Sequence, residues 1–596
     1  MIRRFYATKD NTITNAFDEG LSIRGTGSNM GASDILEVFS IYGQSSSSSG
    51  FSSELSRVLI EFPITEISSS RDDGNIPASG SVSWYLKMFN APHSQTVPSD
   101  FSIVVSAISQ SWEEGYGIDM DYYEDKTRDG IGSNWINAKE RTAATATIEA
   151  STPGSLLNAS TFTLTNAEGT TTTYRINGGG SYDTQAGGTA GNTIDIFFGG
   201  AGTVTHVAEA ITKAINATTN ADMSASDDGT NITITQTTKG TTGNRSNTNN
   251  STGLASVGNF SGATGQWTTA GGDYHASPTF TQTFTTGLED LEIDVSELVE
   301  QWITGSSGGG KENYGFGVKF IDVTETTNRS FFTKKFFGRD SEFHYQKPVL
   351  EARWDSARKD DRGYFYASSS LASAGDNLNK LYLYNNVRGR LRDYPIAPTS
   401  ASIRLTSTAG TGSSLVSASV GRVSTGIYSA SIAVDTTASS VHDIWYSGSV
   451  GYHTGTISVK SFESFGYNPE DTYVLSMPSL RKEYRKNQTH RLNLYVRQKN
   501  WSPNIHTQAV RSSIPSLVIP SASFQLRRCI DDFVVVPYGT GSTSHTGLSY
   551  DVSGNYFDLD TTYLETGYLY DVQYSFYDEE NGWEEQPYRF KFRVVD

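Results

Sequence analysis

The sequence has little cysteine, few basic residues and no long apolar run. Its single cysteine, Cys529, excludes an intrachain disulfide among 596 residues. No stretch approaches the roughly 18 apolar residues that a membrane-spanning helix needs, and residues 1–10 lack the apolar run of a secretory signal. Lys and Arg number 46 against 64 Asp and Glu, and a net charge of −18 disfavours contact with nucleic acid. We therefore expect no membrane insertion and no nucleic-acid partner.

Motifs of the common hydrolases and nucleotide-binding proteins are also missing. None of the nine histidines has the H-x-x-x-H or H-E-x-x-H spacing of a zinc enzyme. There is no G-x-S-x-G nucleophile elbow, and the Gly-Gly-Gly-Lys stretch at 308–311 lacks the Ser or Thr of a phosphate loop. Cys529 lies in the strand-like residues 526–530, which favours a structural thiol over a catalytic one. We expect no enzyme activity, no catalytic residue and no cofactor.

Glycine and aromatic residues are plentiful: the chain has 57 Gly, 29 Phe, 9 Trp and 32 Tyr. Apolar and polar residues alternate with period two over stretches such as 56–62, 81–88 and 101–105, which predicts half-buried strands. Helical spacing is convincing only at 204–215 and 295–303. The sequence therefore predicts an all-β, multi-domain chain with minor helix.

Shifts of composition divide the chain. Charged residues thin out between 143 and 272, whereas the flanking stretches share mixed charge and large aromatics, so we expect one module interrupted by another. The charged run 355–362 is interpreted as a solvated linker. The predicted domains are a discontinuous jelly roll (1–142 plus 273–355), a small inserted α/β module (143–272), an immunoglobulin-like β-sandwich (356–462) and a C-terminal β-sandwich (463–596).

The two outer segments resemble the jelly-roll module of the DNRLRE type, relatives of which occur in bacterial surface and carbohydrate-binding proteins. Six short elements carry the resemblance in the order of that family, and they are NMGASDILEV (29–38), SRVLIEF (56–62), WEEG (112–115), IDV (293–295) with Trp302, NYGF (313–316), and GRDS (338–341) leading to PVLE (348–351). The resemblance implies a fold and not a function, because that type of module does not fix a ligand.

Two further segments resemble virion proteins. The insertion is similar to a small α/β module of tailed-phage structural proteins, with the elements FTLT (162–165), TYRI (173–176), AINA (214–217), ITITQ (232–236) and TTGN (241–244). The last third resembles an uncharacterised virion protein type of large contractile-tailed phages, including those of marine cyanobacteria, with RLNLYVR (491–497), PYGTG (537–541) and GNYFD (554–558). Both resemblances imply a phage particle.

Two clusters of side chains are candidates for binding. Asp119, Asp121, Glu124 and Asp125 offer closely spaced oxygen ligands of the kind that hold Ca²⁺, although a solvated loop explains them as well. In the locally basic strand at 481–497 and just after it, the partner-binding candidates are Arg481, Arg485, Arg491, Arg497 and Trp501. An alternative is that this strand only pairs with acidic residues of its own domain.

Together these features predict a non-enzymatic structural component of a tailed-phage virion, either a neck or collar protein or a tail accessory that mediates attachment or reinforcement. Its C-terminal domain is expected to anchor it. The alternatives are a carbohydrate-binding adhesin or receptor-binding fibre protein, and a head decoration protein. Expected partners are neck, portal-adaptor, tail or capsid proteins, further copies of the chain and, for the adhesin, a surface glycan. The expected location is the virion, assembled in the host cytoplasm.

Overall fold

The computed structural model describes residues 1–17, 22, 24–44, 51–93, 98–118, 132–156, 158–254, 256–327, 329–394, 401–410, 412–460, 473–499, 516–578 and 581–596. Strands account for 47% of it and helices for 10%, so the predicted all-β, multi-domain class is confirmed. Two compact units emerge, unit 1 with residues 1–5, 65–85 and 351–596, and unit 2 with residues 6–64 and 86–350. Within the described residues, no helix is both long and apolar enough to cross a bilayer.

Four elements contribute residues to both units, namely β1 (Ile2–Tyr6), α1 (Ile64–Asp72), β5 (Ser83–Met88) and β21 (Val349–Arg353). Helix α1 has no counterpart among the predicted helices. Only Ile67 and Ser70 are buried in it, so the apolar stripe that marks an amphipathic helix is absent from its sequence.

The outer segments of unit 2 build a seven-stranded sheet with the order β17-β6-β19-β4-β3-β20 and with β2 paired to β4. Its strands are β2 (Lys9–Thr14), β3 (Ile35–Gln44), β4 (Phe51–Glu61), β6 (Phe101–Ile108), β17 (Tyr274–Phe284), β19 (Phe316–Phe320) and β20 (Phe331–Phe337). Strand β18 (Leu291–Asp294) and the helices α3 (Ser296–Thr304) and α4 (Asp322–Glu325) lie between these strands in the sequence. Antiparallel pairing joins β6, before residue 143, to β17 and β19, after residue 272.

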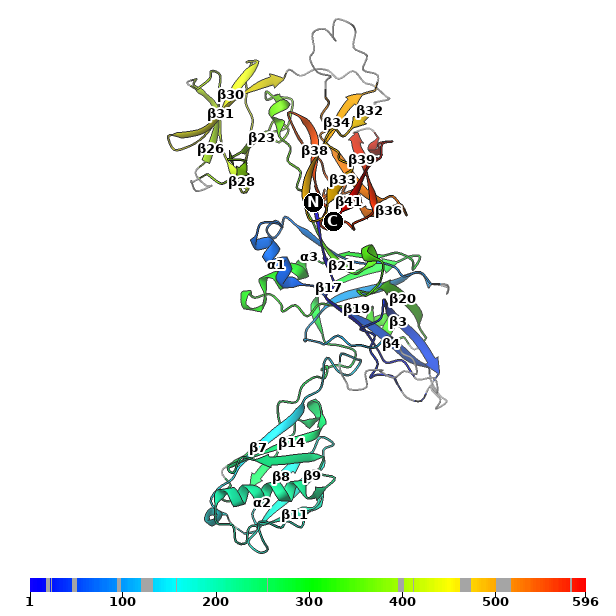
Figure 1. The fold of residues 1–596 in the computed structure, drawn as a ribbon, viewed down its shortest axis with the longest axis vertical. Helices are drawn as coiled ribbons and strands as arrows, with labels where there is room; N and C mark the ends of the chain where they lie inside the picture. The colour runs from blue at the N-terminus through cyan, green and yellow to red at the C-terminus, as the bar shows by residue number, and fades with distance from the viewer. Residues whose placement is uncertain are drawn as a thin grey trace. The chain divides into compact units, whose positions relative to one another are not determined.

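The middle of unit 2 has a hydrophobic core of its own, whose buried members all lie between Ala144 and Ala263. Two four-stranded sheets contribute to it, β11-β9-β8-β15 and β13-β14-β7-β16, together with helix α2 (Val204–Asn216) (Figure 1). The long strands are β7 (Ala143–Glu149), β8 (Thr161–Thr165), β9 (Thr171–Asn177), β11 (Thr193–Phe197), β13 (Met223–Asp227) and β14 (Asn231–Lys239). The shorter strands are β10 (Gly188–Thr189), β12 (Thr218–Thr219), β15 (Thr248–Asn250) and β16 (Ser256–Val257).

The two predicted helices are confirmed. Helix α2 begins where the hydroxyl of Thr203 accepts a hydrogen bond from the backbone N–H of His206, which caps the first turn. Its apolar residues recur every three or four positions, and Val207, Ile211 and Ala214 are buried in the module core. Helix α3 ends at Gly305, whose φ of +69° favours glycine.

Unit 1 contains two groups of strands. The first is a five-stranded sheet, β22-β31-β30-β26-β27, and a three-stranded sheet, β23-β29-β28, around one apolar core. Its strands are β22 (Phe365–Tyr366), β23 (Asn379–Tyr384), β26 (Ala401–Thr406), β27 (Ser414–Ser419), β28 (Gly421–Ser424), β29 (Ile427–Ile432), β30 (Ser440–Ser447) and β31 (Val450–Lys460), with a small hairpin of β24 (Asn386–Val387) and β25 (Arg390–Leu391). This is the region predicted to be an immunoglobulin-like sandwich.

The second group forms the C-terminal sandwich, with sheet orders β32-β34-β38-β37 and β33-β41-β39-β35-β36, and β40 paired to β39. Its strands are β32 (Tyr473–Ser476), β33 (Glu483–Arg485), β34 (Thr489–Gln498), β35 (Ala522–Arg528), β36 (Phe533–Val536), β37 (Ser549–Asp551), β38 (Gly554–Asp560), β39 (Leu569–Asp578), β40 (Gly582–Glu585) and β41 (Phe590–Val595). Aromatic rings join the two sheets, and the Phe557 ring packs edge-on against Tyr574 at 6.3 Å.

Candidate functional site

The predicted binding residues fall partly outside the described part of the chain. Asp119, Asp121, Glu124, Asp125 and Trp501 all lie outside it, so the calcium hypothesis stays a prediction. Within the described residues, no group of three or more His, Cys, Asp or Glu side chains has an arrangement that could hold a metal ion.

The four predicted arginines do not share one surface. Arg491 and Arg497 point outward from β34, because Leu492, Leu494 and Val496 alternate with them and are buried. Arg485 points outward from β33, in the opposite sheet of the sandwich, and Arg481 is exposed just before that strand. The structure therefore spreads the basic residues over two faces of the C-terminal sandwich.

Arg491 has a partner in its own domain. Its Nε lies 3.1 Å from Asp558 Oδ1 on the neighbouring strand β38, and its guanidinium stacks 4.1 Å from the centroid of the Tyr556 ring. This is the intradomain pairing that the sequence left as an alternative. Arg481 and Arg485 are exposed, and neither forms an ion pair with any of the described residues.

The charged run at 355–362 is not a solvated linker. Lys359 forms a parallel β-bridge with Tyr550 of strand β37, and the Tyr550 hydroxyl donates to Asp361 Oδ1 at 2.7 Å. Arg362 Nη2 lies 2.7 Å from Asp443 Oδ2, and Asp443 is fully buried. Residues 358–362, the charged junction, thus bind to both sandwiches of unit 1. The prediction failed because every one of these partners lies far away in the sequence.

A second buried network holds the two chain segments that lead into and out of the inserted module. Ala138 N–H donates to the Gly265 carbonyl at 2.8 Å, and the Trp267 ring N–H donates to the Asn134 carbonyl at 2.8 Å. Trp135 and Trp267 both belong to a core cluster that includes residues of strands β2 and β4. We call residues 134–145 and 261–272 the insertion root.

Arg57 of strand β4 fixes the insertion root to the outer sheet. Its guanidinium makes a bidentate pair with Glu325 at 2.6 and 3.1 Å and donates to the Gly271 carbonyl at 2.8 Å. It also stacks 5.0 Å from the Trp135 ring centroid and 5.7 Å from that of Tyr274. Because both Arg57 and Glu325 are largely buried, each depends on the other for its charge.

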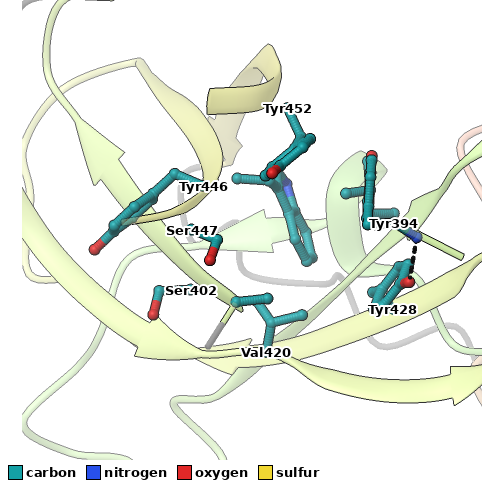
Figure 2. A pocket seen from close by; sticks show the side chains of 10 residues that line it. Tyr394, Ser402, Val420, Tyr428, Tyr446, Ser447 and Tyr452 are labelled. Atoms are coloured by element: carbon teal, nitrogen blue, oxygen red, sulfur yellow. Dashed lines mark hydrogen bonds between the residues drawn. The ribbon is translucent and has the colours of Figure 1, made fainter. Parts of the chain in front are cut away.

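A pocket in the immunoglobulin-like region is lined mainly by aromatic side chains. Figure 2 shows Tyr394 and Tyr428 on one side and Tyr446 with Ser447 on the other, with Tyr452 between them at the top of the view. The space inside it is only about 20 Å³, enough for about one water molecule, so a larger ligand would lie over its opening and not be enclosed by it. Tyr394 lies 5.2 Å from Tyr428 and 4.6 Å from Tyr452, ring centroid to centroid.

Hydrogen bonds fix the tyrosines of this pocket. The backbone N–H of Tyr394 donates to the Tyr428 hydroxyl at 2.9 Å, and this hydroxyl donates to Asp393 Oδ1 at 3.2 Å. Arg422 pairs with the Asp393 carboxylate and lowers its pKa to about 2. Burial raises the pKa of Tyr394 and Tyr428, so both phenols are neutral. Neutral aromatic faces suit contact with an uncharged ligand.

One carboxyl group has a strongly shifted pKa. Burial raises the pKa of Asp10 to about 7, although its Oδ2 accepts a hydrogen bond from the backbone N–H of Arg339 at 2.5 Å. The backbone N–H of Asp10 in turn donates to Glu114 Oε1 at 2.8 Å. These contacts join strand β2 to residues about 100 and 330 positions away, which no local pattern in the sequence indicates.

Cys529 has the surroundings of a structural thiol. Burial raises its pKa, and its Sγ lies 3.5 Å from Asp571 Oδ2, whose negative charge acts in the same direction. A thiol in such surroundings stays protonated at neutral pH, in keeping with the structural role expected from the sequence.

Comparisons with known proteins show no family. No protein-family model and no curated protein matches the chain. A mutant of Salmonella alpha-2-macroglobulin aligns at 8% identity and a TM-score of 0.12, over 54% of this chain and 18% of that one. The Yersinia pseudotuberculosis adhesin InvE aligns at 12% identity and 0.14, over 37% and 61%. A marsupial T cell receptor aligns at 8% and 0.13, over 39% and 70%. The chain spans less than two thirds of either bacterial structure.

Proposed function

We propose that this chain is a non-enzymatic structural component of a tailed-phage virion, in the neck, collar or tail, where it attaches or reinforces other virion proteins. The sequence resemblances motivate the virion. The observation that carries a mechanical role is the construction of the two junctions, the insertion root in unit 2 and the charged junction in unit 1. Each joins modules through paired backbone and buried ionic contacts rather than through a free linker.

Such junctions suit a protein that holds its neighbours in place. A free linker lets modules rotate, whereas several hydrogen bonds and a buried ion pair fix their orientation until they break together. This chain is acidic, with a net charge of −18, but the exposed Arg481 and Arg485 give its C-terminal sandwich a local positive surface. Such a surface can attract an acidic surface of a partner. We therefore place the anchoring surface on β33 and the residues before it.

Purified particles test this proposal. Phage particles that encode the chain are purified from a lysate by density gradient. An antibody raised against the chain then detects it in the particle fraction. We expect the chain in the particle fraction and gold label at the neck or tail. A double variant, Arg481→Glu with Arg485→Glu, should lower its incorporation, whereas Arg491→Met, which removes an internal pair, should not. Absence of the chain from intact particles would show the proposal to be wrong.

The pocket lined by Tyr394, Tyr428, Tyr446 and Tyr452, here called the tyrosine pocket, favours a second candidate function, the binding of a surface glycan. Aromatic faces pack against the C–H face of a sugar ring, and the hydroxyls of the lining residues Ser402 and Tyr452 can exchange hydrogen bonds with it. A glycan array probed with the labelled chain tests this function. Binding that is lost in Tyr452→Ala, and kept in Tyr577→Ala outside the pocket, supports an adhesin. No binding above that of the Tyr452→Ala variant contradicts it.

A further inference from the structure

Lys334 is a lysine that points into the core of unit 2. It lies in the middle of strand β20 and is 1% exposed. Its ammonium nitrogen lies 5.1 Å from the ring centroid of Phe284 and 5.3 Å from that of Phe336. Lysines are almost never fully buried unless they are paired. What surrounds its nitrogen therefore needs an explanation.

The nitrogen of Lys334 contacts three oxygens, and none of them is a carboxylate. Nζ lies 2.6 Å from Asn90 Oδ1, 2.8 Å from the Gly287 carbonyl and 2.7 Å from the Glu289 carbonyl. Burial lowers the pKa of Lys334 to about 8, against partial compensation by Asp290 and Glu289. With its pKa lowered, more of this side chain is free amine at neutral pH than of an exposed lysine, and a desolvated free amine is a nucleophile.

Asn90 is held against this amine by its backbone. Its N–H donates to Asp290 Oδ1 at 2.7 Å, and it forms a β-bridge with Phe336. The backbones on either side are also paired, since Ala91 N–H donates to the Lys335 carbonyl and Phe337 N–H to the Phe89 carbonyl, both at 3.0 Å. The carboxamide carbon is one bond beyond the oxygen that Nζ touches. Fixed backbones and this contact place the two groups in position to react.

We propose that Lys334 and Asn90 join in an intramolecular isopeptide bond. The Nζ lone pair attacks the Asn90 Cγ, the new Cγ–Nζ bond forms, and the Cγ–Nδ2 bond breaks. The proton that Nζ gives up goes to the departing Nδ2, which leaves as ammonia. The reaction joins an amine and a primary amide into a secondary amide, so it needs no oxidant, reductant or co-reactant. Asp290, which accepts a hydrogen bond from the Asn90 backbone N–H and whose charge acts on Lys334, is the nearby carboxylate that could carry the proton.

The bond would join two chain positions that are 244 residues apart. Strand β20 pairs with β3 on one side, so the bond would fasten its other side to the residues that follow β5. The closed loop would contain the whole inserted module. A pulling force applied outside the loop would then pass through the covalent bond and bypass the insertion, in keeping with a mechanical role but independent of any particle.

Mass spectrometry of the full chain tests this proposal. We expect the intact protein to be lighter than its sequence by one ammonia, about 17 Da. A proteolytic digest should contain one branched peptide that joins Asn90 to Lys334. Lys334→Met and Asn90→Ala should each have the full mass of their sequences. Lys335→Met, on the same strand, should keep the loss.

A second measurement does not depend on the folding of any variant. Wild-type protein boiled in denaturant should run faster on a denaturing gel than Lys334→Met, because a closed loop makes the unfolded chain more compact. If the carboxyl group of Asn90→Asp reacts, this variant should lose one water in place of ammonia. If it does not react, the variant should keep its full mass while the wild type loses ammonia. Wild-type protein of full mass with unbranched peptides at both positions would overturn the proposal and leave Lys334 as a hydrogen-bonded lysine only.

Discussion

The insertion root in unit 2 and the charged junction in unit 1 both fix neighbouring modules, but with different chemistry. At the insertion root, two tryptophans fill a core cluster and one arginine pairs with Glu325 beneath them. At the charged junction, Asp361 accepts a hydrogen bond from Tyr550, and Arg362 pairs with the buried carboxylate of Asp443. The first junction depends on apolar burial with a single buried charge pair, and the second on hydrogen bonds to charged groups. The two should therefore respond differently to mutation and to pH.

The largest expected effect comes from removing the inserted module altogether. Deleting residues 146–260, between the two segments of the insertion root, and joining the ends with a short Gly/Ser linker should leave a folded protein, because Thr145 and Ser261 already exchange two backbone hydrogen bonds at 3.0 Å. Calorimetry should show one unfolding transition fewer, or a smaller enthalpy, with the other transitions kept. Aggregation and loss of the strand signal in circular dichroism would mean that the outer segments need the insertion to fold.

The next effect tests the buried charge at the insertion root. Arg57→Met should destabilise unit 2 by about 3–5 kcal/mol, because it leaves the buried carboxylate of Glu325 without a partner and the Gly271 carbonyl without a donor. Chemical denaturation followed by tryptophan fluorescence measures the loss. Arg175→Met removes an exposed pair with Asp195 in the same unit and should change little. Equal effects of the two variants would contradict the distinction between buried and exposed pairs.

At the charged junction a similar change should cost less. Arg362→Met leaves Asp443 with the ring N–H of Trp445 as its remaining donor at 2.8 Å, and we expect a loss of about 2–3 kcal/mol in unit 1. Thermal unfolding followed by circular dichroism measures it. Arg422→Met, which removes a half-exposed pair with Asp393, is the matched control. An unchanged melting temperature for Arg362→Met would mean that this junction holds nothing together.

The smallest effect is a dependence on pH at the charged junction. Burial raises the pKa of Asp360 to about 6 from the usual value of 3.8, so the folded state binds this proton more tightly than the unfolded state. The stabilising contribution is fully present below about pH 4 and is lost as pH rises to about 6 and above. Asp360→Asn should remove this loss and stabilise unit 1 at pH 8 by roughly 2 kcal/mol.

Denaturation at pH 4 and pH 8 measures this effect. The difference in unfolding free energy between Asp360→Asn and the wild type should grow as pH rises between these values. Asp361→Asn is the control, because Asp361 binds Tyr550 and Lys380 as an acceptor and should lose stability at both pH values. A difference that shrinks with rising pH would show that folding lowers the pKa of Asp360 and does not raise it.

Local patterns predicted the regular elements well. Alternation predicted strands such as β4, and spacing of three and four residues predicted α2 and α3 to within a residue at each end. Helix α1 was not predicted, because a nine-residue helix that buries only Ile67 and Ser70 has no apolar stripe. The sequence predicts reliably those helices and strands whose apolar pattern is set by neighbouring residues.

Sites assembled from distant segments could not be predicted. The partners of residues 360–362 lie up to 190 positions away, and Asn90 lies 244 positions from Lys334. The sequence alone therefore could not distinguish the charged residues 355–362 from those of a solvent-exposed linker. The tyrosine pocket draws its rings from three separate strands and the residue Tyr394. For Arg491 the sequence kept the correct alternative, because an acidic strand was a reasonable neighbour for a basic one.

The insertion root also has a genetic consequence. The chain leaves the outer sheet and returns to it at two points that hydrogen-bond to each other, at Ala138 with Gly265 and at Thr142 with Thr264. We therefore expect a foreign domain with adjacent ends, inserted between these points, to leave the host module folded. Recombination within the gene at these two positions would exchange one domain for another and leave the sequence of the host module unchanged.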